Sequence, residues 1–137
     1  MNTYFEQMIL SASPVELIRI LYQCALSAVR DAREHLRGGR IAERSRTINK
    51  AYDVLTELTG ALRPAEAPEL AARLRALYCY MQGRLLEANF RQTDAPLEEV
   101  LMLLTTLAEG WKEAPEASNP GSASRGSEPL AALAVMG

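Results

Sequence analysis

Apolar residues recur at steps of three and four along most of the chain, which is the period of an α-helix with one buried face. Four such stripes are separated by short segments rich in glycine, proline and polar residues. No stretch of the sequence alternates apolar and polar residues with the period of two that is typical of a β-strand. The pattern predicts an all-α protein.

The first predicted helix spans residues 14–36 and has the clearest boundaries. Ser13 is placed to cap its start, a proline occupies the first helical position, and Glu16 completes a capping box. Gly38 and Gly39 follow the last apolar position. A glycine at this point supplies the left-handed residue that ends many helices.

Three further helices are expected at residues 41–62, 68–90 and 96–112. Pro64 follows the second stripe, and Pro68 opens the third. Connections of about three to six residues make neighbouring helices antiparallel, so the economical architecture is an antiparallel four-helix bundle.

The two ends of the chain differ in composition from the helical region. We expect residues 1–113 to form one bundle domain, with an apolar N-terminal arm over residues 1–12. Residues 114–137 are expected to be a flexible tail, because proline, serine, glycine and glutamate dominate its first part and bury little apolar surface. The tail ends in an apolar run, Leu130 to Met136, which either touches nothing or folds back onto the bundle.

The charge pattern excludes several classes of partner. The chain has 15 Lys and Arg against 17 Asp and Glu, a net charge of −2, and no basic cluster that would neutralise a run of phosphates. Its apolar runs fall far short of the ~20 residues of a membrane span, and its N-terminus does not resemble a secretory signal. We therefore expect a cytoplasmic protein that neither binds nucleic acid nor inserts into membranes.

Catalytic chemistry has no visible basis in the sequence. The single histidine, His35, stands among charged residues and is interpreted as a solvated surface residue. Cys24 and Cys79 are interpreted as small, buried, reduced side chains, because two isolated cysteines form neither a metal site nor a disulfide framework. We assign no catalytic, metal-binding or cofactor-binding residue and expect no cofactor.

The helix predicted at 68–90 is apolar on more than one side. Besides its main stripe, it carries Tyr80, Leu86 and Phe90, which need another surface. A helix that is apolar around so much of its circumference either lies at the centre of a bundle or offers a second face to a partner.

A series of short motifs follows the helices in order across about residues 4–113. They are Ser11-Ala12-Ser13-Pro14, Glu16-Leu17, Leu21-Tyr22, Ile48-Asn49-Lys50-Ala51, Glu57-Leu58, Leu77-Tyr78-Cys79-Tyr80-Met81, Arg84-Leu85, Glu87-Ala88-Asn89, Glu98-Glu99-Val100, Leu103-Leu104 and Trp111-Lys112. In order and spacing this series resembles the FliS family of flagellin export chaperones, which are bacterial and cytoplasmic.

The resemblance implies a function. Proteins of this family are antiparallel helical bundles that bind the disordered C-terminal region of flagellin in apolar grooves, prevent its premature polymerisation and help to deliver it to the flagellar type III export gate. The expected groove lining lies on the second and third helices: Ile48, Ala51, Tyr52, Leu55, Tyr78, Met81 and Leu85. Tyr4, Ile9 and Leu10 would belong to the family's N-terminal arm, which takes part in docking at the export gate.

A rival interpretation is a self-associating helical bundle with a structural or scaffolding role. It would use the same apolar faces to form a homodimer and bind no cargo. A small helical enzyme is a weaker alternative, because the inward stripes are almost wholly apolar and supply no converging polar groups.

Overall fold

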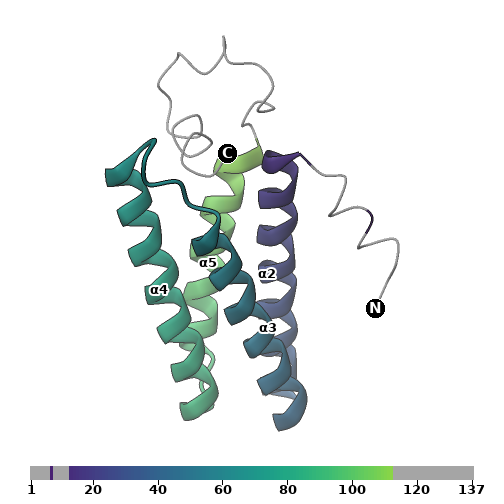
Figure 1. Ribbon diagram of the computed structural model, residues 1–137. Coiled ribbons are helices and arrows are strands. Elements are labelled where there is room, and N and C mark those ends of the chain that lie inside the picture. Colours follow the sequence, from purple (N-terminus) through teal and green to yellow (C-terminus); the bar gives the residue numbers. More distant parts are fainter. Residues whose placement is uncertain (1–6, 8–12, 113–137) are drawn as a thin grey trace.

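The computed structural model describes Gln7 and residues 13–112, and within this part of the chain it contains four long helices. They are α2 (Pro14–Arg37), α3 (Ile41–Gly60), α4 (Pro68–Arg91) and α5 (Ala95–Lys112). Consecutive helices run in opposite directions and stand side by side (Figure 1). The predicted antiparallel four-helix bundle is confirmed.

Helix α2 begins with the predicted capping box. The Glu16 backbone N–H donates to Ser13 Oγ at 3.2 Å, and the Ser13 N–H donates to Glu16 Oε1 at 3.5 Å. The capping box thus gives a partner to two backbone N–H groups that an uncapped helix start would leave without one. At the C-terminal end of α2, Gly39 has φ +70°, the left-handed conformation that the paired glycines predict.

Helix α3 ends at Gly60, short of the predicted Leu62. The N–H of Ala61 donates to the Glu57 and Leu58 carbonyls at 3.1 and 3.2 Å, and the N–H of Leu62 donates to the Thr59 carbonyl at 3.2 Å. This tighter bonding ends the α-helix and lets the Leu62 side chain lie in the core, where it is 8% exposed.

One hydrophobic core joins all four helices. Helices α2 and α4 lie diagonally across the bundle, because each packs mainly against α3 and α5. Tyr22 of α2 and Tyr78 of α4 bridge this diagonal through their buried hydroxyl groups, whose oxygens lie 2.6 Å apart. Burial raises the pKa of both phenols above the ordinary value near 10.

The interpretation of the two cysteines as buried was wrong. Cys79 is exposed and Cys24 is half-buried, because both lie beside the buried stripes of their helices, α4 and α2. His35 is a partly exposed surface residue, and its Nδ1 accepts a hydrogen bond from Arg40 Nε at 2.9 Å.

The predicted domain boundaries remain predictions. Apart from Gln7, the N-terminal arm and the whole of the predicted tail lie outside the described residues. Among the described residues, no helix combines the length and the apolar character that crossing a membrane requires.

Candidate cargo-binding surface

The predicted groove residues lie mostly inside the bundle. Six of the seven are fully buried, and Tyr52 is half-buried. The six buried residues come from α3 and α4 and belong to the common core of the bundle: Ile48, Ala51, Leu55, Tyr78, Met81 and Leu85. The helical period therefore identified the faces of α3 and α4 that point into the core. A groove on the outer surface of these two helices would be bounded by other side chains.

Polar contacts cross the outer side of the α3/α4 junction. Gln82 donates from Nε2 to the Tyr52 carbonyl at 3.1 Å and to Thr56 Oγ1 at 2.9 Å. Nearer the other end, Arg44 Nε donates to Asn89 Oδ1 at 2.9 Å, and Arg44 is 5% exposed. These bonds hold α4 against α3.

Arg44 and Asn89 were missed by the sequence reasoning as a structural pair. Arg44 lies beside the apolar stripe of its helix, where a charged side chain is usually exposed to solvent. Its stem follows the core while its guanidinium reaches the Asn89 side chain and carbonyl. The motif Glu87-Ala88-Asn89 contributes to the family resemblance, but no local signal in the sequence pairs Asn89 with α3.

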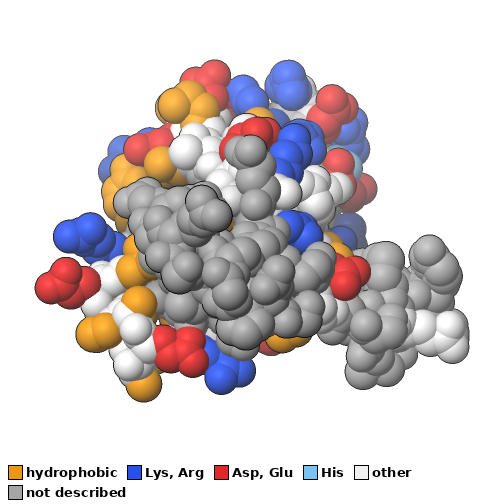
Figure 2. All heavy atoms as spheres, turned by 90° about the horizontal axis from the view of Figure 1, so that it is seen from above, with side chains coloured by type: hydrophobic (Ala, Val, Ile, Leu, Met, Phe, Trp, Pro, Cys, Tyr) orange, Lys and Arg blue, Asp and Glu red, His pale blue; other side chains and the backbone are white. Residues whose placement is uncertain are grey.

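Five large hydrophobic side chains remain exposed among the described residues. Phe90 and Leu86 of α4 are 87% and 49% exposed, and Met102 of α5 is 66% exposed. The others are Ile41 and Tyr80. In Figure 2 hydrophobic side chains gather, among charged ones, on the left flank, the side on which α4 stands in Figure 1. Leu86 and Phe90 lie off the buried stripe of α4, on the second apolar side that the sequence pattern indicates.

Tyr80 differs from Leu86 and Phe90 because its hydroxyl group forms hydrogen bonds within the bundle. It donates to Glu99 of α5 at 2.8 Å, and Arg84 Nε donates to the same carboxylate at 2.6 Å. Arg84 also pairs with Glu87 at 2.9 Å. The hydrogen bond from Tyr80, followed by that from Arg84, lowers the pKa of Glu99. This cluster fastens α4 to α5 on the surface.

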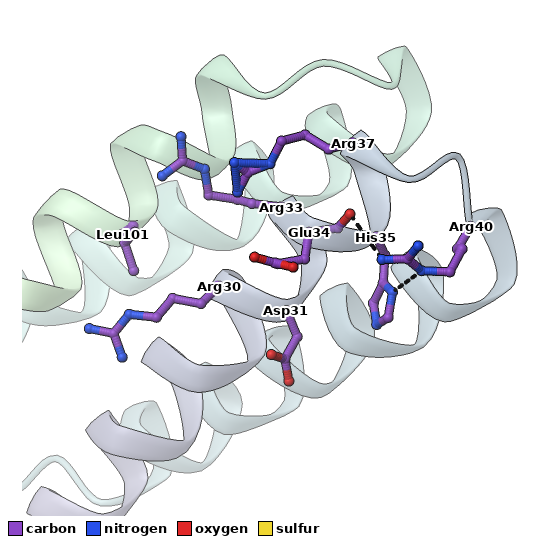
Figure 3. Close-up of a pocket in the computed structure, with 8 residues that line it drawn as sticks. All are labelled: Arg30, Asp31, Arg33, Glu34, His35, Arg37, Arg40 and Leu101. Atoms are coloured by element: carbon purple, nitrogen blue, oxygen red, sulfur yellow. Dashed lines mark hydrogen bonds between the residues drawn. The ribbon is translucent and has the colours of Figure 1, made fainter.

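A polar pocket of about 390 Å³ lies near the C-terminal end of α2 (Figure 3). Arg33 makes a two-pronged contact with Asp94, with nitrogen to oxygen distances of 2.8 and 2.7 Å. This hydrogen-bonded pair lowers the pKa of the Asp94 carboxyl. The pocket contains both acids and bases, including Asp31 and Glu34 beside the arginines, so it selects no single sign of charge.

The described part of the chain shows no candidate metal site. No cluster of three or more His, Cys, Asp or Glu side chains in this part of the chain could hold a metal ion. His35, the one histidine, is engaged with Arg40 and has no nucleophile among its hydrogen-bond partners.

Comparison with known proteins identifies the family. The family model described as "Flagellar protein FliS" matches residues 1–118. The chain belongs to the FliS family. It is therefore a flagellar secretion chaperone that acts on an export cargo, and the family is non-enzymatic.

Several FliS relatives match most of their length. The flagellar secretion chaperone FliS of Salmonella typhimurium is 38% identical over 115 residues, which cover 82% of this chain and 85% of the relative. The FliS proteins of Escherichia coli and Bacillus subtilis are 33% and 30% identical, over 79% and 82% of this chain and 80% and 84% of the relatives.

Proposed function

We propose that this chain binds the disordered C-terminal region of flagellin in the bacterial cytoplasm, prevents its premature polymerisation and aids its delivery to the flagellar type III export gate. Membership of the FliS family supports the proposal. The observation that carries it is the exposed apolar surface of α4, where Phe90 and Leu86 stand uncovered in the described chain.

The chemistry of the cargo explains why such a surface is needed. A flagellin end that later packs as helices must be apolar on one face, so its free chains tend to associate before export. A chaperone has to cover that face without folding the cargo into a compact body, which a narrow export channel would exclude. Ordering a disordered segment costs about 2–5 kcal/mol, so a long contact with the chaperone is required.

The helix-in-groove mode of recognition suits a bundle of antiparallel helices. The proposed lining is Ile48, Ala51, Tyr52, Leu55, Tyr78, Met81 and Leu85, with the buried members as the floor and Tyr52 nearest the surface. Leu86 and Phe90 of α4 stand at the side of this groove, and Ile41 of α3 lies at the same end of the bundle as Phe90 (Figure 1). These exposed side chains are the accessible apolar anchors for the cargo.

The N-terminal arm is the proposed contact with the export gate. Tyr4, Ile9 and Leu10 carry its apolar character. All three lie outside the described residues, so this part of the proposal rests on the family alone.

Substitutions on the surface of α4 test the binding proposal. Leu86→Asp and Phe90→Asp should each weaken binding of a C-terminal flagellin segment by about tenfold or more, because each places a carboxylate where an apolar anchor contacts cargo. Calorimetry with the full chain measures the affinity. Met102→Asp is the matched control, since Met102 is also exposed but lies on α5.

Circular dichroism separates binding from folding. Both α4 variants should keep the helical spectrum, since neither side chain belongs to the core. Ile48→Asp and Tyr78→Asp should lose it, because both residues are fully buried. If the folded α4 variants bind cargo with unchanged affinity, the cargo binds elsewhere on the bundle. If the chain forms a one-to-one complex with no flagellin segment at all, the self-associating bundle is favoured.

A further inference from the structure

An apolar groove opens at one end of the bundle, between the first turns of α2 and the end of α3. Its volume is about 520 Å³, within the range of roughly 300–1,000 Å³ that is usual for ligand sites. Its apolar lining consists of Pro14, Leu17, Ile18, Gly60, Ala61 and Leu62. Among the described residues that line it, Arg63 alone is charged. We call this surface the end groove.

Two small residues leave the α3 side of the end groove open. Nothing described lies within 4 Å of the position that a Cβ on Gly60 would take, and Ala61 adds only a methyl group. On the α2 side Leu17 is only half-buried. An occupant can therefore bring its backbone close to α3 where its own side chain is small, and a large apolar side chain finds a partner in Leu17.

The chain leaves α5 next to the end groove. Arg19 directly follows Ile18 of the groove lining. Its Nε donates to the Trp111 carbonyl at 2.8 Å, and its Nη2 donates to the Lys112 carbonyl at 3.4 Å. These bonds tie the last turn of α5 to the first turns of α2, at the same end of the bundle (Figure 1). The segment that follows Lys112 in sequence therefore starts close to the groove.

The apolar run at residues 130–136 is within reach of the end groove. Seventeen residues lie between Lys112 and Leu130, and their composition predicts a flexible linker with a mean span of roughly 20–25 Å. Neighbouring helices lie about 8–10 Å apart, so such a linker reaches the groove. Phe90 lies about 30 Å from this end of the bundle, because each residue of α4 advances about 1.5 Å. The end groove is thus the nearer apolar surface.

The side chains of the run match the groove in size. Leu130 and Ala134 share one side of the run in a helix and in a strand, because a step of four residues returns to about the same side in both. Leu130 supplies a large apolar side chain for the space beside Leu17. Ala134 is small enough to let the backbone of the run pass close to Gly60.

The charges agree with the same placement. Residues 129–136 carry no charged side chain, as an apolar groove requires. Glu128 comes directly before them, and Arg63 at the edge of the groove is exposed and forms no ion pair within the described chain. A surface pair between the two adds little affinity, but it sets the direction in which the run enters.

The N-terminal arm is a poorer match for this groove. Between Tyr4 and Leu10 it has no glycine or alanine. A large side chain would therefore stand wherever its backbone crossed Gly60, and the backbone would stay farther from α3.

We propose that the end groove is the docking site of this chain's own apolar run, residues 130–136, with Leu130 as the anchor. A free run of seven residues binds weakly, because it buries little area. Tethering gives it an effective concentration in the millimolar range, so a contact of about millimolar affinity is occupied about half of the time. The run lies beyond residues 1–118, which the family model matches, so the contact is a property of this chain. It covers an apolar surface that would otherwise invite nonspecific association.

Disulfide trapping in the full chain without cargo tests the contact. Cys24 and Cys79 are first replaced by serine. Gly60→Cys with Ala134→Cys should then form a disulfide within one chain under mild oxidation, because docking brings the two Cα atoms within the roughly 4.4–6.8 Å that a disulfide requires. Gly110→Cys with Ala134→Cys is the matched control, since Gly110 also has open space around it and lies nearer to the start of the linker.

The rates of the two pairs decide between docking and random contact. We expect the Gly60 pair to link about tenfold faster than the Gly110 pair. Equal or faster linking in the Gly110 pair overturns the proposal, because a run that docks nowhere would meet the nearer cysteine at least as often. Disulfides that join two chains and increase with concentration would assign the groove to the run of a second copy, which also overturns it.

A charge in the run tests the anchor. Leu130→Asp should slow linking of the Gly60 pair about tenfold, because a carboxylate is excluded from an apolar groove. Ser122→Asp is the matched control, since it adds the same charge to the linker outside the run, and it should leave the rate unchanged. Equal rates in the two variants would contradict the role of Leu130.

Amide resonances of the otherwise natural chain distinguish the run from the N-terminal arm. Leu130→Asp should shift the signals of Gly60 and Ala61, because it releases the run from the groove, and Ile9→Asp should leave them in place. The reverse pattern would assign the groove to the arm and overturn the proposal. No flagellin is present in these measurements, so their outcome is independent of cargo binding.

Discussion

Tyr22 and Tyr78 show how a polar contact is kept inside an apolar bundle. Each hydroxyl would lose its hydrogen bond to water on burial, and the 2.6 Å contact between them replaces it across the bundle diagonal. The described core contains no buried side-chain nitrogen or oxygen without a partner. The pair therefore satisfies its own polar groups and also fixes how α2 and α4 face one another.

The raised pKa of this pair predicts a loss of stability in alkali. Above pH 10 the unfolded tyrosines lose their protons while the buried ones keep them, so the unfolded state binds fewer protons and stability falls with rising pH. The stabilisation is complete below pH 10 and falls by up to about 1.4 kcal/mol per pH unit for each tyrosine. Urea unfolding between pH 8 and 11 measures the slope.

The double variant Tyr22→Phe/Tyr78→Phe is the control for that experiment, because it removes both titrating groups and leaves the apolar shape. Its stability should depend much less on pH above 10. An equal slope in the variant would assign the alkaline loss to other groups.

Ser13 carries the second prediction at this scale. Ser13→Ala should lower the free energy of unfolding by about 1 kcal/mol, because the Glu16 N–H loses its acceptor at the start of α2. Thermal melting measures the change. Ser27→Ala lies in the middle of the same helix at an exposed position and should change the midpoint little or raise it slightly. Equal effects of the two substitutions would contradict the capping role.

At the scale of the helices, the sequence was sufficient for the architecture because each helix has local signals at its ends. The capping box at Ser13, the glycine pair after α2 and Pro68 all act within a few residues. The predicted end of α3 lies two residues too late, since Leu62 continues the apolar stripe after the helix has ended at Gly60. A stripe records which side chains are buried, and a residue beyond the last turn can be buried too.

The same limit explains what the sequence could not decide about the groove. Periodicity placed Ile48, Tyr78 and Leu85 on inward faces, but it does not separate the floor of a groove from the centre of a core. The contact between Arg44 and Asn89 joins two helices that are far apart in sequence, so only the packed bundle reveals it. Leu86 and Phe90 were identified because a helix has room for one buried stripe and they lie off it.

The turn between α2 and α3 gives a prediction at the element scale. Gly39→Ala should destabilise the protein by about 1 kcal/mol, because φ +70° costs a side chain that much. Gly38→Ala should cost less. Its φ is −85°, and the added methyl group would meet only the Arg40 guanidinium, the mobile end of a long side chain. Chemical unfolding of the two variants ranks them, and a larger loss for Gly38→Ala would contradict this account.

At the scale of the whole molecule, cargo binding and the rival self-association would use the same exposed side chains. Leu86 and Phe90 of α4 are the proposed anchors for flagellin, and a self-associating bundle would cover them with a second copy. One surface cannot hold both occupants, so each would reduce the apparent affinity of the other, and this reciprocity follows from linkage.

Competition is therefore the last prediction. If the chain self-associates through α4, titration with the C-terminal flagellin segment should yield complexes of one chaperone and one cargo chain. The apparent affinity should then fall as the chaperone concentration rises. Light scattering coupled to gel filtration gives the mass of the complex, and calorimetry gives the affinity. A complex of two chaperones with two cargo chains would show that the surfaces are separate, and the dimer could then persist during cargo binding.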